Sequence, residues 1–463
     1  MKTTLTSLLL VLILFTACQQ PRSFDSPTYL GGQIMNPKSD YVLFSENEEI
    51  LDTLWLDQKG RFIKTIPVFE DGLYTFKHGN EYQYIFLQPS DSLIFRLNTW
   101  DFDESLVFSG IGSARNEYLI DLFIQNEKED AQLRALFNLP PEDLKEEIEG
   151  VRLRKQRDLN DFILESEEQN NLYIRYARAA IDYPLYRKME IYPLALRNYL
   201  RSEKIPEVPV DFYDYRKNID LNDPVLANFY SHRNYVLSYL YHLAYEKTID
   251  NKDKGINTYL IEYVNDSINE LNLKESLLTS AIYEEFFTGA TLNLNQQVTT
   301  AFFETSTNKE LNDKVSNLIA DSQKIANGSK LKDFEVLNQN LKPYSINALI
   351  KNRNTVIYFW SEQEIEAIKL AGKINYLQKK YPMLLFIGVN LDYDEQHPLS
   401  INSLKYINEQ TQFALPSHSV ANSYNTSGFT RTILVNRYGY VIDNFANISS
   451  RYFEKSLKFL EKN

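Results

Sequence analysis

The spacing of apolar and polar residues along the chain changes character twice. From residue 28 to residue 112, stretches such as YVLFSE, TLWLDQKGRF and LYTFKHG alternate apolar with polar residues and are separated by turn residues. Because successive side chains of a strand point to opposite faces, this alternation predicts short antiparallel strands with one buried face. We interpret residues 28–112 as a small all-β, sandwich-like domain.

The interval 113–327 has the spacing of helices instead. Only three glycines occur in it, while Leu, Glu, Lys, Arg and Tyr recur at helical spacing. This pattern predicts an α-helical region made of several helices. Proline lacks the backbone N–H and clashes with the preceding turn, so it interrupts a helix. We therefore expect breaks near four prolines: Pro184, Pro193, Pro206 and Pro209.

In the interval 328–463, continuous apolar runs alternate with amphipathic segments. RNTVIYFW and MLLFIGV are runs of the kind found in strands buried on both faces of a sheet. Between them, SEQEIEAIKLAGKINYLQ places Ile365, Ile368 and Ile374 on one helical face. SINSLKYINEQ predicts a second helix, TRTILVNRYGYVIDNF a hairpin and SRYFEKSLKFLEKN a closing helix. The chain is thus predicted to be an α+β multidomain protein whose C-terminal α/β domain has the order β-α-β-α-β-β-α.

The N-terminus has the features of an export signal. Residues 1–17 contain Lys2, the apolar run LLLVLILF and then small residues, and the run is too short to span a bilayer. FTAC, which ends at Cys18, resembles a bacterial lipobox. The resemblance implies cleavage before Cys18, diacylation of Cys18 and acylation of the new N-terminus, with residues 18–27 as lipidated cysteine and linker. The alternative is an ordinary signal peptide with an incidental cysteine.

The residue after the cysteine bears on the destination. It is Gln19, whereas the residue that usually retains lipoproteins in the inner membrane is Asp. By resemblance to other lipoproteins, we expect an anchor in the outer membrane, facing the periplasm. Cys18 is also the only cysteine of the chain. If it carries lipid, the mature protein has no free thiol and forms no disulfide.

Charge and motifs exclude several other functions. The formal net charge of −13 argues against sequence-independent nucleic-acid binding, which relies on clustered Lys and Arg. There is no P-loop, HExxH or GxSxG motif. His232 and His242 lie ten residues apart rather than three or four, so we interpret them as ordinary histidines. LDYDEQH, at 391–397, is interpreted as a loop of solvated acids, with a cation site as the alternative. We predict no catalytic residue, metal or cofactor.

Two parts of the chain resemble known families. GSKLKDFEV, VIYFW and GFTRTILVNRYGYVI make residues 328–463 similar to the C-terminal domain of TlpA-type, thioredoxin-like proteins. FSGIGSARNEYL, with Pro89 and Asp91, makes residues 28–112 resemble a domain of unknown function that precedes such domains in Bacteroidetes lipoproteins. The first resemblance implies a thioredoxin-like fold and a redox Cys-x-x-Cys at a helix start.

The redox landmarks of that family are absent from this chain. The two cysteine positions fall at about Glu364 and Ala367, and the cis-proline position falls at Thr430. Ser361 and Glu364 fit a capping box, in which each side chain bonds the backbone N–H of the other residue. The alternative for Glu364 is a catalytic carboxylate.

The vacated groove is nevertheless a candidate binding surface. The thioredoxin fold implies that it is lined by residues from two segments, namely Trp360, Ser361, Glu364, Phe429, Thr430 and Arg431. One expectation is an ion pair between Glu364 and Arg431 that closes the groove. The other is that Glu364 caps the helix and Arg431 points into solvent, which leaves the groove open for an extended partner segment.

These inferences favour one function over two alternatives. We interpret the chain as a cell-envelope lipoprotein, held to the membrane by lipid, whose redox-inactive thioredoxin-like domain serves as a binding or assembly module for an envelope protein or peptide. On this interpretation the chain is not an enzyme. The alternatives are a thiol-disulfide oxidoreductase family member by fold and a nutrient- or glycan-capture lipoprotein that binds in the aromatic-rich helical region.

Overall fold

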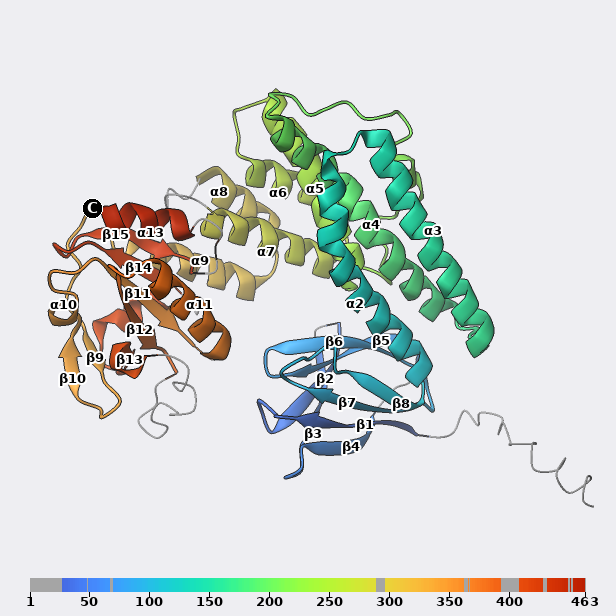
Figure 1. The fold of residues 1–463 in the computed structure, drawn as a ribbon, viewed down its shortest axis with the longest axis horizontal. Helices are drawn as coiled ribbons and strands as arrows, with labels where there is room; N and C mark the ends of the chain where they lie inside the picture. The colour runs from blue at the N-terminus through green and yellow to red at the C-terminus, as the bar shows by residue number, and fades with distance from the viewer. Residues whose placement is uncertain are drawn as a thin grey trace, which may run out of the picture. The chain divides into compact units, whose positions relative to one another are not determined.

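The computed structural model describes most of the chain after the predicted export signal (Figure 1). The described residues are 27–47, 49–66, 70–288, 296–361, 365, 367–392, 408–427, 431–448, 450 and 453–462. By its contacts the chain divides into two compact units. Unit 1 comprises the residues up to 129 together with 157–180, and unit 2 comprises 130–156 together with 181–463. Part of the predicted helical region therefore belongs to each unit.

Unit 1 contains two four-stranded sheets. One has the order β4-β1-β7-β8 and the other the order β3-β2-β5-β6. The first is built from β1 (Thr28–Met35), β4 (Arg61–Ile66), β7 (Ser92–Asn98) and β8 (Val107–Ile111). The second is built from β2 (Tyr41–Glu46), β3 (Glu49–Trp55), β5 (Gly72–His78) and β6 (Glu81–Leu87).

The inner faces of the two sheets form one core. Leu30 and Phe95 of the first sheet cluster with Phe44 and Phe76 of the second, and all four are at most 1% exposed. The rings of Phe76 and Phe95 stack with their centroids 4.4 Å apart. The expectation of antiparallel strands was wrong for one pair, since β1 and β7 run parallel. The physical reason is that β2 to β6 lie between them in sequence, so no tight hairpin fixes their relative direction.

The junction between β8 and the first helix is buried and polar. Asn116 bonds both backbone groups of Phe86, accepting from its N–H at 2.7 Å and donating to its carbonyl at 2.9 Å. Arg115 Nη2 donates to Asp91 Oδ2 at 2.5 Å, and Arg115 Nη1 donates to Glu168 Oε2 at 3.4 Å. Gly110 and Gly112 both have positive φ. The FSGIGSARNEYL motif thus has a structural role in the described fold.

Eight helices follow within the described ranges. They are α2 (Ser113–Ala135), α3 (Pro141–Ser166), α4 (Asn171–Leu200), α5 (Tyr230–Asp250), α6 (Ile256–Ser267), α7 (Leu271–Thr288), α8 (Gln296–Thr305) and α9 (Lys309–Gln323).

Two of the four predicted helix breaks are wrong. Pro184 and Pro193 lie inside α4, which continues through both of them. The neighbouring side chains Leu185, Met189 and Tyr192 are buried in a common cluster, so packing outweighs the hydrogen bonds that the prolines remove. Pro206 and Pro209 fall in the irregular segment after α4 ends.

A seven-stranded sheet forms the C-terminal part of unit 2, with the order β10-β9-β13-β12-β11-β14-β15. Strands β11, β12 and β13 are parallel, β14 is antiparallel to them, and β15 is antiparallel to β14 and so runs in the direction of β11. The strands are β9 (Glu335–Leu337), β10 (Pro343–Ser345), β11 (Thr355–Trp360), β12 (Leu385–Asn390), β13 (Gln412–Ala414), β14 (Thr432–Val435) and β15 (Val441–Ala446). The helices are α10 (Ile346–Leu349), α11 (Ala367–Lys380) and α13 (Phe453–Lys462).

Every residue of β11 is buried, as its continuous apolar run predicted. Val356 and Tyr358 pack on one face of the sheet with residues of α11 and α13, and Ile357 and Phe359 pack on the other face. The predicted helix SINSLKYINEQ falls almost entirely outside the described residues. Apart from that interval, β11, α11, β12, β14, β15 and α13 occur in the expected order, whereas β10 and β13 were not expected.

The β8 junction generates a stability prediction. Gly110 has φ of +88°, and a methyl group on it would collide with the backbone carbonyl of Ser92. We expect Gly110→Ala to lower the free energy of unfolding by about 2 kcal/mol or more. The matched control is Gly372→Ala in α11, where a methyl group meets nothing within 4 Å and should add about 0.5–1 kcal/mol. Urea denaturation measures both, and equal effects would contradict the role given to Gly110.

Candidate functional site

The outer face of the β4-β1-β7-β8 sheet carries two rows of side chains. Ile63, Gly31, Ile94 and Ser109 are neighbours across the four strands. Because side chains alternate between faces, the next row on the same face, two residues along each strand, is Arg61, Gln33, Arg96 and Val107.

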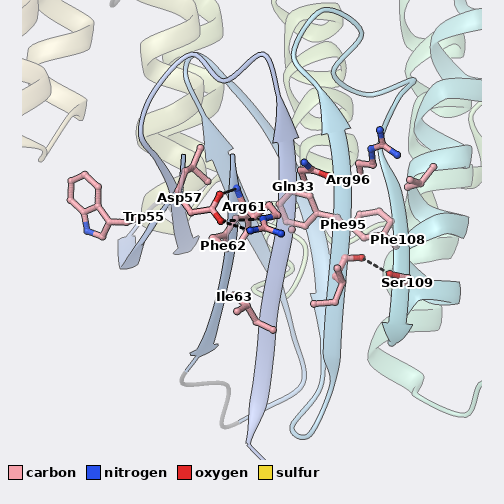
Figure 2. Close-up of a pocket in the computed structure, with 14 residues that line it drawn as sticks. Gln33, Trp55, Asp57, Arg61, Phe62, Ile63, Phe95, Arg96, Phe108 and Ser109 are labelled. Carbon is pink, nitrogen blue, oxygen red and sulfur yellow. Dashed lines mark hydrogen bonds and ion pairs between the residues drawn. The ribbon is translucent and has the colours of Figure 1, made fainter. Parts of the chain in front are cut away.

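A hollow of about 860 Å³ lies over these rows (Figure 2). Gly31 lies between Ile63 and Ile94 in the first row but does not itself line the hollow, and a Cβ there would lie 2.9 Å from Ile94 Cδ1 and 3.2 Å from Ile63 Cβ. Without that atom the two isoleucines close over the strand. Ile63 is 70% exposed and Val107 is 55% exposed, so the floor is apolar and open to solvent. Exposed apolar patches of this kind often mark binding surfaces.

One edge of the hollow holds an ion pair that is internally neutral. Asp57 Oδ2 accepts from Arg61 Nε at 3.0 Å and from Arg61 Nη2 at 2.9 Å. Its other oxygen accepts the backbone N–H groups of Lys59 and Arg61. These bonds, first that from the Arg61 backbone and then that from its side chain, lower the pKa of the Asp57 carboxyl. The pair presents a fixed guanidinium but no net charge.

Arg96 differs from Arg61, although both lie in the same row. Within the described part of the chain, its guanidinium has one hydrogen-bond partner, the sulfur of Met35 at 3.0 Å, and forms no ion pair. A thioether sulfur is a weak acceptor that carries no charge. Gln33 lies between the two arginines and donates to the Lys59 carbonyl at 3.3 Å. The hollow therefore contains one positive charge without a compensating carboxylate.

An exposed tryptophan stands at the edge of the hollow. Trp55, at the end of β3, is 68% exposed, and its ring meets that of Tyr41 edge-on with centroids 5.6 Å apart. Figure 2 shows its ring projecting away from the sheet, on the side of Asp57. This contact orients the indole and leaves its surface accessible. This surface was not predicted. Ile63 and Val107 are apolar residues at strand positions that alternate with buried residues, and that pattern could have indicated it.

Of the site residues predicted from sequence, four lie outside the described residues. They are Cys18, Glu364, Phe429 and Thr430. Trp360 is 1% exposed and packs in the core with α11 and α13. The Ser361 hydroxyl donates to Asp392 Oδ1 at 2.5 Å. The expected capping box with Glu364 remains a prediction.

Arg431 does not point into solvent, so that expectation was wrong. It is 1% exposed, and its guanidinium donates to the carbonyls of Tyr424 at 2.5 Å and Asp321 at 3.2 Å, and also to the Asn444 carbonyl. The guanidinium lies 4.7 Å from the centre of the Phe445 ring. Burial lowers the pKa of Arg431 to about 10. The side chain is drawn inward because these buried carbonyls need donors.

The segment before β14 is tied to α9. Asp321, which is fully buried, accepts from Thr426 Oγ1 at 2.6 Å and from the Ser427 N–H at 2.8 Å. Together with the Arg431 bond to the Asp321 carbonyl, these contacts join α9 to the C-terminal sheet. They use the polar groups of this segment for packing rather than for chemistry.

A buried charge cluster lies in the helical part of unit 2. Glu190 is fully buried and accepts from Arg216 Nε at 2.9 Å, from Tyr215 Oη at 2.7 Å and from His242 Nδ1 at 2.9 Å. Burial alone would lower the pKa of His242, but its bonds to Glu190 and Glu246 outweigh burial and raise it. Burial alone would raise the pKa of Glu190, but its bonds from His242 and Arg216 hold it low. The cluster fixes the segment 201–229 between α4 and α5.

His232 takes no part in that cluster. Its Nε2 lies 3.1 Å from the Asp220 carbonyl. In the described ranges, no group of three or more His, Cys, Asp or Glu side chains is arranged to hold a metal ion. None of the described helices combines the length and apolarity that crossing a membrane requires.

Comparisons with known proteins bear on less than a third of the chain. No family model matches the chain, and no curated protein is significantly similar to it. Among solved structures, the thioredoxin domain of a thiol-disulfide oxidoreductase from Bacteroides vulgatus is 18% identical, with 29% of this chain and 99% of that chain covered and a TM-score of 0.23.

Two further structures have similar identities, coverages and TM-scores. A thiol:disulfide interchange protein from Bacteroides sp. is 21% identical, with 26% of this chain and 80% of that chain covered and a TM-score of 0.22. An exposed lipoprotein thioredoxin from Streptococcus pneumoniae is 13% identical, with 28% of this chain and 100% of that chain covered and a TM-score of 0.23. These similarities cover less than a third of this chain, at identities of 13–21%.

The Glu190 cluster predicts a pH dependence. Because the folded-state pKa of His242 is raised, its stabilising effect is complete below the unfolded value near 6.5 and is lost as pH rises through the folded value. We expect the free energy of unfolding to fall from pH 6 to pH 9, and His242→Gln to flatten that fall and to cost about 1–3 kcal/mol at pH 6.

The matched control for this prediction is His232→Gln in the same helix. His232 is not part of the Glu190 cluster, and its Nε2 lies against a neutral carbonyl, so the substitution should leave the pH dependence in place. Chemical denaturation at several pH values supplies the measurement. If the free energy of unfolding depends on pH in His242→Gln as it does in the wild type, the role assigned to the cluster is wrong.

Proposed function

We propose that the protein is a cell-envelope lipoprotein that binds a ligand on the outer face of its N-terminal sheet. The observation that carries this proposal is the apolar hollow with one uncompensated arginine, Arg96, and an exposed tryptophan, Trp55. A largely apolar concavity with a few polar groups is the usual form of a small-molecule site. Such a face has no evident role in the core of the domain.

The thioredoxin-like domain, on this proposal, takes no part in thiol exchange. Exchange proceeds by attack of a thiolate on a disulfide, and the chain has no cysteine after Cys18. If Cys18 is acylated, no thiolate remains. The domain then contributes stability and surface rather than redox chemistry. Similar structures are named as oxidoreductases, and those names describe those proteins. For this chain, thiol exchange is the competing hypothesis.

The helical region is a weaker candidate for ligand capture than the hollow. Its tyrosines are largely core residues, since Tyr173, Tyr192 and Tyr235 are at most 1% exposed. Tyr186 and Tyr215 stack on one another with their ring centroids 4.3 Å apart. A stacked ring offers at most one face to a sugar or peptide, which favours the β-sheet surface as the capture site.

The lipid anchor would hold that surface near the membrane. The linker 19–27 has nine residues between the proposed acylation site and β1, which reach at most about 30 Å when extended. Two or more acyl chains give stable anchoring, whereas a single chain gives only marginal binding. We place the protein at the outer membrane, facing the periplasm, with an envelope ligand or partner.

The anchor makes a direct prediction about the mature N-terminus. We expect intact-protein and peptide mass spectrometry to find Cys18 as the first residue, carrying a diacylglyceryl group and an N-acyl chain. Cys18→Ser should abolish both processing and membrane association, while Gln19→Ser should leave both intact. A mature N-terminus downstream of Cys18, without lipid, would refute the anchor.

The binding surface is tested by photo-crosslinking in the native envelope. We expect a benzophenone amino acid in place of Ile63 to yield a discrete adduct, and the same group in place of Tyr376 of α11, which is 49% exposed, to yield none. Ser109→Trp, which fills the hollow, should remove the Ile63 adduct. Equal adducts from both positions, or an adduct that survives Ser109→Trp, would contradict binding in the hollow.

A further inference from the structure

The charge of the hollow restricts what it can bind. Of the two guanidinium groups on this face, that of Arg61 is neutralised by Asp57, whereas that of Arg96 is not neutralised by any described residue. Arg61 and Arg96 belong to the same cross-strand row, with Gln33 between them. The net charge presented by this row is therefore a single positive charge at Arg96.

A guanidinium group presents a fixed fork of N–H donors that forms two parallel hydrogen bonds with a carboxylate or a phosphate. A dianion such as a phosphate monoester suits the hollow less well. Of the two lining arginines only Arg96 has no carboxylate partner among the described residues, and the Asp57 carboxylate would repel a second negative charge. The electrostatics thus favour a monoanion, and a carboxylate is a monoanion that the fork can bind through two hydrogen bonds.

The apolar floor restricts the rest of the ligand. Ile63, Ile94 and Val107 line a hollow of about 860 Å³, which lies within the usual range of small-molecule sites, about 300–1,000 Å³. Its floor is one face of a sheet, to which β4, β7 and β8 contribute these three residues. A flat skeleton buries more of its surface on such a floor than a branched one. Trp55 adds an aromatic surface at the edge.

Resting on the proposed function, we infer that the hollow binds a small monocarboxylate with a flat apolar skeleton. The carboxylate pairs with the Arg96 guanidinium, and the Gln33 amide lies beside it. The skeleton lies over Ile63 and Ile94, within reach of the Trp55 side of the hollow. A peptide strand or a lipid surface could contact the apolar face without placing a carboxylate at Arg96.

The test is a charge series on one skeleton. We expect 2-naphthoate to bind the mature full-length protein about 10- to 100-fold more tightly than 2-naphthalenemethanol, since a hydrogen-bonded charge pair has about that effect on affinity. 2-Naphthylmethylamine should bind more weakly than the alcohol. Isothermal titration calorimetry gives the three dissociation constants.

Three variants locate the effect. Arg96→Gln should remove the preference for naphthoate and leave the affinity for the alcohol unchanged. The matched control is Arg437→Gln, because Arg437 belongs to the thioredoxin-like domain and its guanidinium lies over the Tyr438 ring at 5.0 Å; it should change nothing. Ile63→Asp should weaken all three compounds, since it places a charge on the apolar floor.

Several outcomes overturn the inference. Equal affinities across the series, no binding of any of the three compounds, or a naphthoate preference that survives Arg96→Gln would each do so. Displacement of bound naphthoate by a strand-forming peptide or by lipid vesicles of higher affinity would assign the hollow to that partner instead. If the benzophenone at position 63 still forms its adduct and Ser109→Trp still removes that adduct, the ligand class is wrong but binding in the hollow stands. If the adduct also fails, the proposed function fails with it.

Discussion

The buried contact between Arg115 and Asp91 is the constraint on which unit 1 depends. Both side chains are at most 5% exposed, and breaking such a pair leaves an uncompensated charge in the interior, at a cost of about 3–5 kcal/mol. Asn116, next in sequence, bonds both backbone groups of Phe86. The first helix, β6 and the turn before β7 are thereby held in one arrangement. This junction and the aromatic core stabilise the domain from within.

Unit 2 uses a buried arginine in a comparable way. Arg431 lies where the resemblance to thioredoxin-like proteins placed a groove residue, yet its donors bond the carbonyls of Tyr424, Asp321 and Asn444. A cation bonded only to neutral carbonyls is costly to bury, which is consistent with its lowered pKa. Its bonds join α9 to the sheet. Among the described residues of the predicted groove, the buried Arg431 therefore serves packing.

The comparison of sequence and structure shows which features periodicity can predict. The apolar run of β11 predicted a strand buried on both faces, and all six residues are buried. Helix breaks at Pro184 and Pro193 were predicted from local chemistry alone and were overridden by packing of Leu185, Met189 and Tyr192. The direction of Arg431 could not be predicted, because its partners lie in α9, before β14 and in β15, far apart in sequence.

The candidate site was missed for a different reason. Alternation along β4 and β8 identifies two faces of each strand but not which strands are neighbours, so the row that joins Arg61, Gln33 and Arg96 exists only once the strand order is known. The parallel pairing of β1 with β7, which places Gln33 beside Arg96, was itself predicted wrongly. An ion pair between Asp57 and Arg61 is local and could be read from the sequence. Whether a carboxylate lies beside Arg96 depends on the fold and cannot be seen in the sequence.

The overall charge of the protein limits how such a site can work. A chain with net charge −13 repels acids at long range, so it gains nothing from steering an acidic ligand toward the hollow. Salt screens exposed charges beyond about 8–10 Å, and at the ionic strength of most environments the repulsion is confined to that range. Discrimination must then arise within contact distance, from the Arg96 fork and the apolar floor together. A neutral analogue would be expected to arrive as quickly as the acid and to leave sooner, so selectivity at this surface would reside in the rate of dissociation rather than in capture.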